Sequence, residues 1–251
     1  FSQTAFVLAL AENSCRVVEV SADLPARSLK LDNLPKSAAS AVGTANVNSR
    51  SPSGRIQGAE GQNVRLRQYA RKVDAALRPF LAGRHTPLIL VATGRLQPLF
   101  RSVSSYAELL EQGIAQSPEH MSDQDLADAA RPILDDHYAN EVDDIRSRFE
   151  QLLSQGRATS DIEVASRAAT LGAVDTILVD IDAVVPGHVD ETTGAVAFSD
   201  HEGADSYGVV DEILRRTLLH GGTALGVRQE DLPAPGALAA VLRYVPVSTE
   251  V

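Results

Sequence analysis

The stretch Asn63–Leu81, NVRLRQYARKVDAALRPFL, predicts the element on which the first half of the chain is built. Apolar side chains recur in it at spacings of three and four residues, which is the pattern of a helix with one buried face. They are Leu66, Tyr69, Val73, Leu77 and Phe80. Basic side chains fall on the flanks and back of that face. Gly83 ends the helix, and Leu88–Thr93 is then typical of a short buried strand in a parallel sheet.

Strands are expected before this helix. Ala5–Ala11 and Cys15–Ser21 are apolar runs separated by an Asn-Ser turn, and residues 29–31 are a candidate third strand. Pro35–Gly61 is rich in Ser, Ala, Asn and Gly and has no apolar period. This composition predicts a long loop with a short helical turn at Ser37–Val42, mobile in the free protein and ordered by a partner.

The second half predicts helices that alternate with short strands, which is typical of an α/β layer architecture. Ser122 and Asp125 match a capping box that opens a long helix reaching Gly156, and Pro132 should kink or split that helix. Ser160 and Glu163 match a second capping box, for a helix ending at Gly172. The other expected elements are a strand at 174–181, an exposed turn-rich segment at 186–203, a helix at 204–219, and strands at 223–227 and 240–245.

Charge is distributed unevenly along the chain. Between Arg50 and Arg101 there are ten basic and two acidic residues, although the net charge of the whole chain is −10. A local reversal of this kind favours a polyanionic partner, most commonly nucleic-acid phosphates. A solvated helix face without a partner is the alternative. The residues expected to contact RNA are Arg50, Arg55, Arg65, Arg67, Arg71, Lys72 and Arg78.

Composition and motifs exclude several other classes of protein. The chain is 44% hydrophobic and 22% charged, which predicts a folded core. A single cysteine, Cys15, excludes a disulfide within the chain and disfavours a cysteine-based metal site. There is no apolar stretch near the about 18 residues of a membrane span and no visible secretion signal, so we expect a cytoplasmic protein. Phosphate-loop, dinucleotide and nucleophile-elbow motifs are absent, so we expect no cofactor.

Two groups of residues were tested as catalytic or metal sites. Asp180 and Asp182 follow four apolar residues, a pattern that resembles the haloacid dehalogenase-like phosphatases. That resemblance implies a nucleophile at Asp180, an acid/base at Asp182 and Mg²⁺, but the family also needs a downstream lysine and this chain has none after Lys72. We therefore favour acids that cap a strand end. The second group is a possible metal or binding patch of His188, Asp190 and His201; overall we expect no metal.

The order of several motifs resembles the bacterial archaeo-eukaryotic release factor family, which is related to archaeal and eukaryotic class 1 release factors and to Pelota. The motifs are Ala5–Val20, Gly58-Ala59-Glu60-Gly61-Gln62, the arginine-rich helix, Val174–Asp180 and the closing run from Gly221 to Tyr244. The resemblance extends over most of the chain and implies two α/β domains. Residues 1–118 would be an RNase H-like middle domain, and residues 119–251 an α/β/α sandwich of the kink-turn-binding ribosomal protein type.

In true release factors, a Gly-Gly-Gln tip orders water against the ester that joins peptide to tRNA. By position, Gly61 and Gln62 match its last two residues and are the implied catalytic pair, whereas Glu60 replaces the first glycine. A carboxylate among RNA phosphates is electrostatically unfavourable, and the conformational freedom of a glycine is lost. We therefore expect a ribosome- or tRNA-associated protein of rescue, release-like or dormancy-related function, without efficient peptide release.

Two other classes of function remain open. The first is an enzyme, either a peptidyl-tRNA hydrolase acting through Gln62 or a phosphatase acting at Asp180 and Asp182. The second is a protein-interaction module that binds a protein partner through the acidic second half of the chain. Cosedimentation with ribosomes over a salt series would discriminate among them, because phosphate contacts weaken as salt rises.

Overall fold

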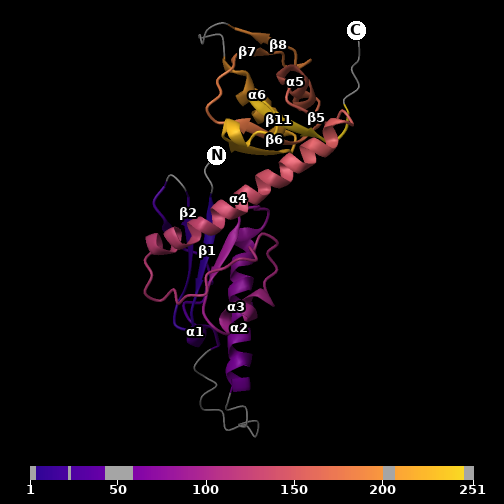
Figure 1. Cartoon of the computed structure of the whole chain (residues 1–251). Helices are drawn as coiled ribbons and strands as arrows, with labels where there is room; N and C mark the ends of the chain where they lie inside the picture. The colour runs from indigo at the N-terminus through magenta and orange to yellow at the C-terminus, as the bar shows by residue number, and fades with distance from the viewer. Residues whose placement is uncertain (1–3, 22–23, 43–58, 200–206, 246–251) are drawn as a thin grey trace. The chain divides into compact units, whose positions relative to one another are not determined.

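The structure is a computed structural model that describes residues 4–21, 24–42, 59–199 and 207–245. The chain divides into two compact units, Ser2–His137 and Tyr138–Val251 (Figure 1). The division falls inside one long helix, α4 (Asp123–Leu153), whereas the boundary indicated by the sequence precedes that helix. No helix among the described residues is long and apolar enough to cross a bilayer.

The first unit is built on a four-stranded sheet in the order β3-β2-β1-β4. Strands β1 and β2 form an antiparallel hairpin, whereas β1 and β4 run parallel. Single parallel bridges from Leu88 to Leu109 and from Val91 to Ile114 extend the pairing of β4. The strands are β1 (Ala5–Leu10), β2 (Cys15–Val20), β3 (Arg27–Leu29) and β4 (Leu88–Val91).

Helix α2 (Ala59–Leu81) packs against this sheet through the apolar face that its sequence predicts (Figure 1). Tyr69 is fully buried, and its hydroxyl donates to the carbonyl oxygen of Ala11 at 3.0 Å. Phe80 is only partly buried and meets the edge of the Phe6 ring, with 4.9 Å between centroids. The predicted helical turn is confirmed as α1 (Ala38–Val42), and α3 (Leu96–Arg101) follows β4.

The second unit has a mixed sheet in the order β10-β6-β11-β5 and a smaller sheet in the order β8-β7-β9. One face of the larger sheet packs against α5 (Ile162–Thr170) and α6 (Val209–Leu219). The end of α4 packs against the other face, through Ile145 and Phe149. The strands are β5 (Ala158–Thr159), β6 (Val174–Asp180), β7 (Pro186–Val189), β8 (Val196–Phe198), β9 (Tyr207–Gly208), β10 (Thr223–Val227) and β11 (Leu238–Leu242), and a short 3-10 turn lies at Gln229–Asp231.

The helices of the second half confirm one predicted cap, correct another and exclude a split at Pro132. The capping box of α4 is present, because the Asp125 carboxylate accepts from the backbone N–H of Ser122 and the Ser122 hydroxyl accepts from that of Asp125. Pro132 does not split α4; it is exposed, and buried apolar residues on both sides of it hold the helix. The cap of α5 is Asp161 and not Ser160, since the Asp161 carboxylate accepts from the N–H of Val164 at 3.0 Å.

The segment 186–203, predicted to be turn-rich, instead forms a hairpin of β7 and β8 as far as it is described. Its turn is closed by Asp190, whose carboxylate accepts from the N–H groups of Thr192 and Thr193 at 3.0 and 2.6 Å. A hydrogen bond from the Thr193 hydroxyl at 2.7 Å, followed by these two backbone N–H groups, lowers the pKa of Asp190. The sequence indicated turns in this segment but not the two strands, which at four and three residues are too short to show an apolar alternation.

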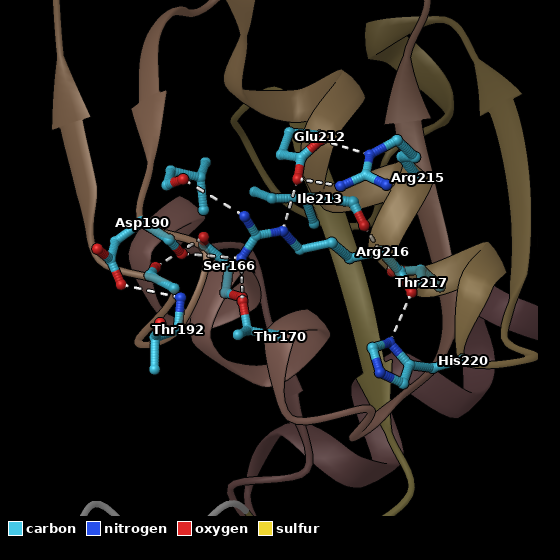
Figure 2. Close-up of polar contacts among 12 residues, drawn as sticks. Ser166, Thr170, Asp190, Thr192, Glu212, Ile213, Arg215, Arg216, Thr217 and His220 are labelled. Atoms are coloured by element: carbon cyan, nitrogen blue, oxygen red, sulfur yellow. Dashed lines mark hydrogen bonds and ion pairs between the residues drawn. The ribbon is translucent and has the colours of Figure 1, made fainter.

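Arg216 of α6 holds this hairpin to the rest of the second unit (Figure 2). Its side chain is buried and donates to the carbonyl oxygens of Val189 and Asp190 at 3.3 and 3.0 Å. It also donates to the Thr170 hydroxyl of α5 at 2.6 Å and to the Glu212 carboxylate at 2.7 Å. One guanidinium therefore connects α5, α6 and the hairpin, and Glu212 balances its charge.

The unit should lose stability in acid through Glu212. Hydrogen bonds from Arg215, and to a smaller extent from Arg216, lower the pKa of Glu212 to about 2 from 4.5, against the opposing effect of burial. The carboxylate therefore stabilises the folded state above about pH 4.5, and this contribution is lost as the pH falls toward about 2. Glu212→Gln should be less stable than wild type near neutral pH, and the gap should narrow with acidification.

Urea unfolding of the two proteins at about pH 6, 4 and 3 measures this gap. Glu163→Gln is the control, because Glu163 forms an exposed ion pair with Arg167 that contributes little to stability. A gap between wild type and Glu212→Gln that stays constant with pH would contradict the assignment.

Candidate nucleic-acid interface

Helix α2 begins at Ala59, which changes the expected setting of Gly61 and Gln62. The sequence predicted that both residues belong to a loop tip and that the helix starts at Asn63. In the structure they lie in the first turn of the helix, because Ala, Glu and Gln are good helix formers and extend it by one turn. The remainder of the predicted mobile loop, 43–58, lies outside the described residues, and so do Arg50 and Arg55.

The Gln62 carboxamide is exposed, and both of its ends have partners. Its Nε2 donates to Oε1 of Glu12 at 3.4 Å, and its Oε1 accepts from Nη1 of Arg95 at 3.5 Å. Glu12 follows β1 and Arg95 follows β4, so the three side chains meet where the two parallel strands end. These bonds are long, which means that the carboxamide is held only weakly.

A pocket of about 310 Å³ surrounds this contact. Its polar lining consists of Glu12, Gln62, Thr93, Arg95, Ser117 and Glu119. The carboxyl ends of parallel strands are a common position for binding sites. The lining contains carboxylates, hydroxyls, an amide and a guanidinium, but no histidine or cysteine. Such a set can orient a polar ligand or a water molecule. Only Gln62 was singled out from the sequence; the positions of Glu12 and Arg95, each just after a predicted strand, were the available signal for the rest.

Three predicted RNA-contacting residues lie free on the outer surface of α2. Arg65, Arg67 and Arg71 are exposed and have no hydrogen-bond or ion-pair partner within the described part of the chain. They lie on the flanks and back of the helix, away from the buried face that includes Leu66 and Val73. Their guanidinium groups are therefore available to phosphates without any loss of packing.

The two other described members of the predicted set have partners inside the unit. Lys72 donates from Nζ to the carbonyl oxygen of Ala41 at 2.6 Å. Arg78 donates from Nε and Nη2 to Oδ2 of Asp74, at 2.9 and 2.7 Å. Asp74 is 3% exposed and also accepts from the N–H of Ser105 at 3.0 Å. Arg78 therefore neutralises a buried carboxylate, and the spacing of four residues between them was the sequence signal for this pair.

The other candidate chemical groups have structural partners. Oδ1 of Asp180 accepts from the N–H of Asp182 at 3.0 Å, so the carboxylate caps the turn after β6. In the described residues no three or more His, Cys, Asp or Glu side chains are grouped to hold a metal ion, and His201 lies outside those residues. Burial raises the pKa of the Cys15 thiol to about 12, so this thiol is not a nucleophile near neutral pH.

Comparison with known proteins identifies the class to which this fold belongs. Archaeal Pelota, in a structure of the ribosome-bound protein with ABCE1, is 15% identical with a TM-score of 0.55 over 96% of this chain and 61% of its own. Dom34 of S. cerevisiae, a translation termination-like factor that interacts with Hbs1, is 12% identical with a TM-score of 0.53 over 97% of this chain and 64% of its own. The fold is thus mixed α/β and Pelota-like, and the chain spans less than two thirds of either relative.

The family follows from the sequence itself. Residues 2–140 match the bacterial archaeo-eukaryotic release factor family 11, and the chain belongs to that family. The resemblance identified from the order of the motifs is therefore confirmed. No curated protein sequence matches the chain significantly.

Proposed function

We propose that this chain associates with the ribosome or tRNA as a release-factor-like protein of bacterial translation, in the cytoplasm, without efficient peptide release. The observation on which the proposal depends is the free arginine surface of α2, formed by Arg65, Arg67 and Arg71. It is supported by membership of a release factor family and by the fold shared with a ribosome-bound Pelota. Such binding would serve ribosome rescue, a release-like step or ribosome dormancy.

The setting of Gln62 supports binding without release. A residue that orders water in the peptidyl transferase centre must project beyond its own domain, whereas Gln62 lies in a helical turn and contacts Glu12 and Arg95. Glu60 precedes the Gly-Gln pair and adds a negative charge that RNA phosphates disfavour. Peptidyl-tRNA hydrolysis through Gln62 is the alternative, and it would require the carboxamide to leave its contacts with Glu12 and Arg95.

The second unit is proposed to bind a protein partner. Residues 138–251 include nineteen acidic and eight basic residues, so this half of the chain would repel RNA and attract a basic protein surface. Archaeal Pelota with ABCE1, and Dom34 with Hbs1, are relatives that assemble with other proteins. As part of the same proposal, the first unit is an RNase H-like domain and the second is an α/β/α sandwich of the kink-turn-binding ribosomal protein type.

The triple variant Arg65→Ala/Arg67→Ala/Arg71→Ala tests the proposal. Each phosphate contact contributes about 0.7 to 0.9 to the slope of log K against log salt. Cosedimentation with ribosomes should therefore weaken by at least about tenfold near physiological salt, and the slope should flatten by about two to three units. Melting curves should stay close to wild type, because none of the three side chains is buried.

The matched control is Arg27→Ala/Arg146→Ala/Arg167→Ala, which removes the same charge from exposed ion pairs elsewhere. A folded α2 variant that binds ribosomes as well as this control would contradict the proposal. Gln62→Ala separates binding from hydrolysis: it should leave binding within about twofold, because one neutral side chain contributes little affinity. Release of peptide by wild type that disappears in Gln62→Ala would favour the hydrolase alternative.

A further inference from the structure

A groove of about 650 Å³ lies between α2 and the segment 30–35 that follows β3. Lys30 lies on one wall and Lys72 on the other, and Asp32 is the acidic residue of the lining. The floor is apolar and includes Ala76, Pro79 and Phe80. The groove is distinct from the Gln62 pocket, with which it shares no lining residue.

The basic surface of α2 continues into this groove. Arg65, Lys72 and Pro79 are spaced by seven residues, which is two helical turns, so they follow one line along the helix. Successive members are about 10 Å apart along the axis. Arg65 is exposed beyond the groove, and Lys72 and Pro79 line it. A polyanion bound at Arg65 therefore has a basic path toward Lys30.

Both lysines have donors to offer a phosphate. Lys72 uses one N–H on the carbonyl oxygen of Ala41, and an ammonium has three donors. Lys30 has no hydrogen-bond or ion-pair partner among the described residues. Asp32 reduces the positive potential but does not cancel it, since two lysines line the same groove.

The floor includes an aromatic ring, that of Phe80. Phe80 packs edge-on against Phe6, and the Arg84 guanidinium lies 4.7 Å from the centroid of the Phe80 ring. The Phe80 ring and the neighbouring exposed Pro79 provide an apolar surface for bases. A basic groove combined with aromatic contacts is the usual arrangement for single-stranded nucleic acid.

We propose that this groove holds a short single-stranded segment of RNA, with phosphates on Lys30 and Lys72 and bases against Pro79 and Phe80. The proposal rests on the proposed RNA-binding function and adds Lys30, which charge counting along α2 does not reveal. A protein partner with acidic side chains would meet the lysines but would not need the Phe80 ring, which a base can stack on.

Binding of a fluorescent ten-nucleotide oligouridylate to the whole chain tests the proposal. Lys30→Met should weaken the affinity about threefold to tenfold and flatten the salt slope by about 0.7, the value for one phosphate of a single strand. Asp32→Asn should tighten binding, because it removes the acid that faces the strand. Lys36→Met is the charge-matched control, an exposed lysine nearby that does not line the groove.

Equal effects of Lys30→Met and Lys36→Met would overturn the proposal, because only net charge would then matter. Inorganic polyphosphate or an RNA duplex that binds more tightly than the oligouridylate at equal charge would also overturn it, since neither offers free bases. If ribosome binding depends on the α2 arginines but Lys30→Met leaves oligouridylate binding unchanged, the groove proposal is wrong and the proposed function stands. If ribosome binding does not depend on these arginines but Lys30→Met weakens oligouridylate binding, the proposed function is wrong and the groove proposal stands.

Discussion

Replacing Arg216 with methionine should destabilise the second unit by about 3 to 5 kcal/mol, the range found when one partner of a buried ion pair is removed. The guanidinium is 5% exposed and connects α5, α6 and the β7–β8 hairpin. Without it, the carbonyl oxygens of Val189 and Asp190 lose the hydrogen bonds from the guanidinium in a place that water reaches poorly, although the Asp190 oxygen keeps the N–H of Gly194. Glu212 would keep Arg215 as its only partner in this network (Figure 2).

Urea unfolding monitored by circular dichroism measures this loss. Arg215→Met is the matched control, because Arg215 also binds Glu212 but its side chain is 60% exposed, so the control should lose less stability than Arg216→Met. Both variants remove one positive charge from the same helix. Similar losses in the two variants would mean that the hairpin does not depend on the buried guanidinium.

A methyl group at Gly194 should cost about 3 kcal/mol or more, from two separate causes. Gly194 lies in the β7–β8 turn with φ +71°, a conformation that disfavours side chains by about 1 to 2 kcal/mol. A Cβ built there would lie 2.6 Å from Oγ1 of Thr170 and 2.9 Å from the carbonyl oxygen of Ser166. The Ser166 hydroxyl also donates to the Gly194 carbonyl oxygen at 2.8 Å, so the turn cannot move away from α5 freely.

Gly221→Ala separates the two causes. Gly221 belongs to the same unit and has φ +70°, but nothing lies within 4 Å of the position of its Cβ. It should therefore lose only the conformational part, about 1 to 2 kcal/mol. Equal melting temperatures for Gly194→Ala and Gly221→Ala would show that close packing of the turn on α5 contributes nothing.

The predictable parts of this protein have local causes. The spacing of Leu66, Tyr69, Val73 and Leu77 predicts the buried face of α2, because a helix repeats every 3.6 residues whatever it packs against. The same holds for the capping box at Ser122 and for the short apolar runs that became β1, β4 and β6. Charge counting located the basic surface of α2, and the order of the motifs indicated the family that residues 2–140 confirm.

The pairing of charged side chains could be predicted only where both partners lie on one helix. Lys72 follows the line of Arg65 along α2, and Arg78 lies on the side of Arg67 and Arg71. Lys72 and Arg78 have partners within the unit, whereas none is found for the three arginines among the described residues. Lys72 reaches Ala41, on a segment brought near α2 only by folding, whereas Arg78 pairs with Asp74 one turn before it on the same helix. Folding also decides that Ser105 donates to Asp74. Periodicity places a residue on a face of its own helix but does not show which atoms approach that face.

Sequence by itself determined the class of fold, the face of α2 that is buried, the basic character of its outer surface and the release factor family. Tertiary structure decided that Gln62 lies between Glu12 and Arg95 and that Arg216 holds the hairpin. The physical reason is the separation along the sequence between the residues that interact. Helix and strand patterns arise from neighbours a few residues apart, whereas the Gln62 contacts join residues 50 and 33 positions apart and include charged groups whose partners depend on the final packing.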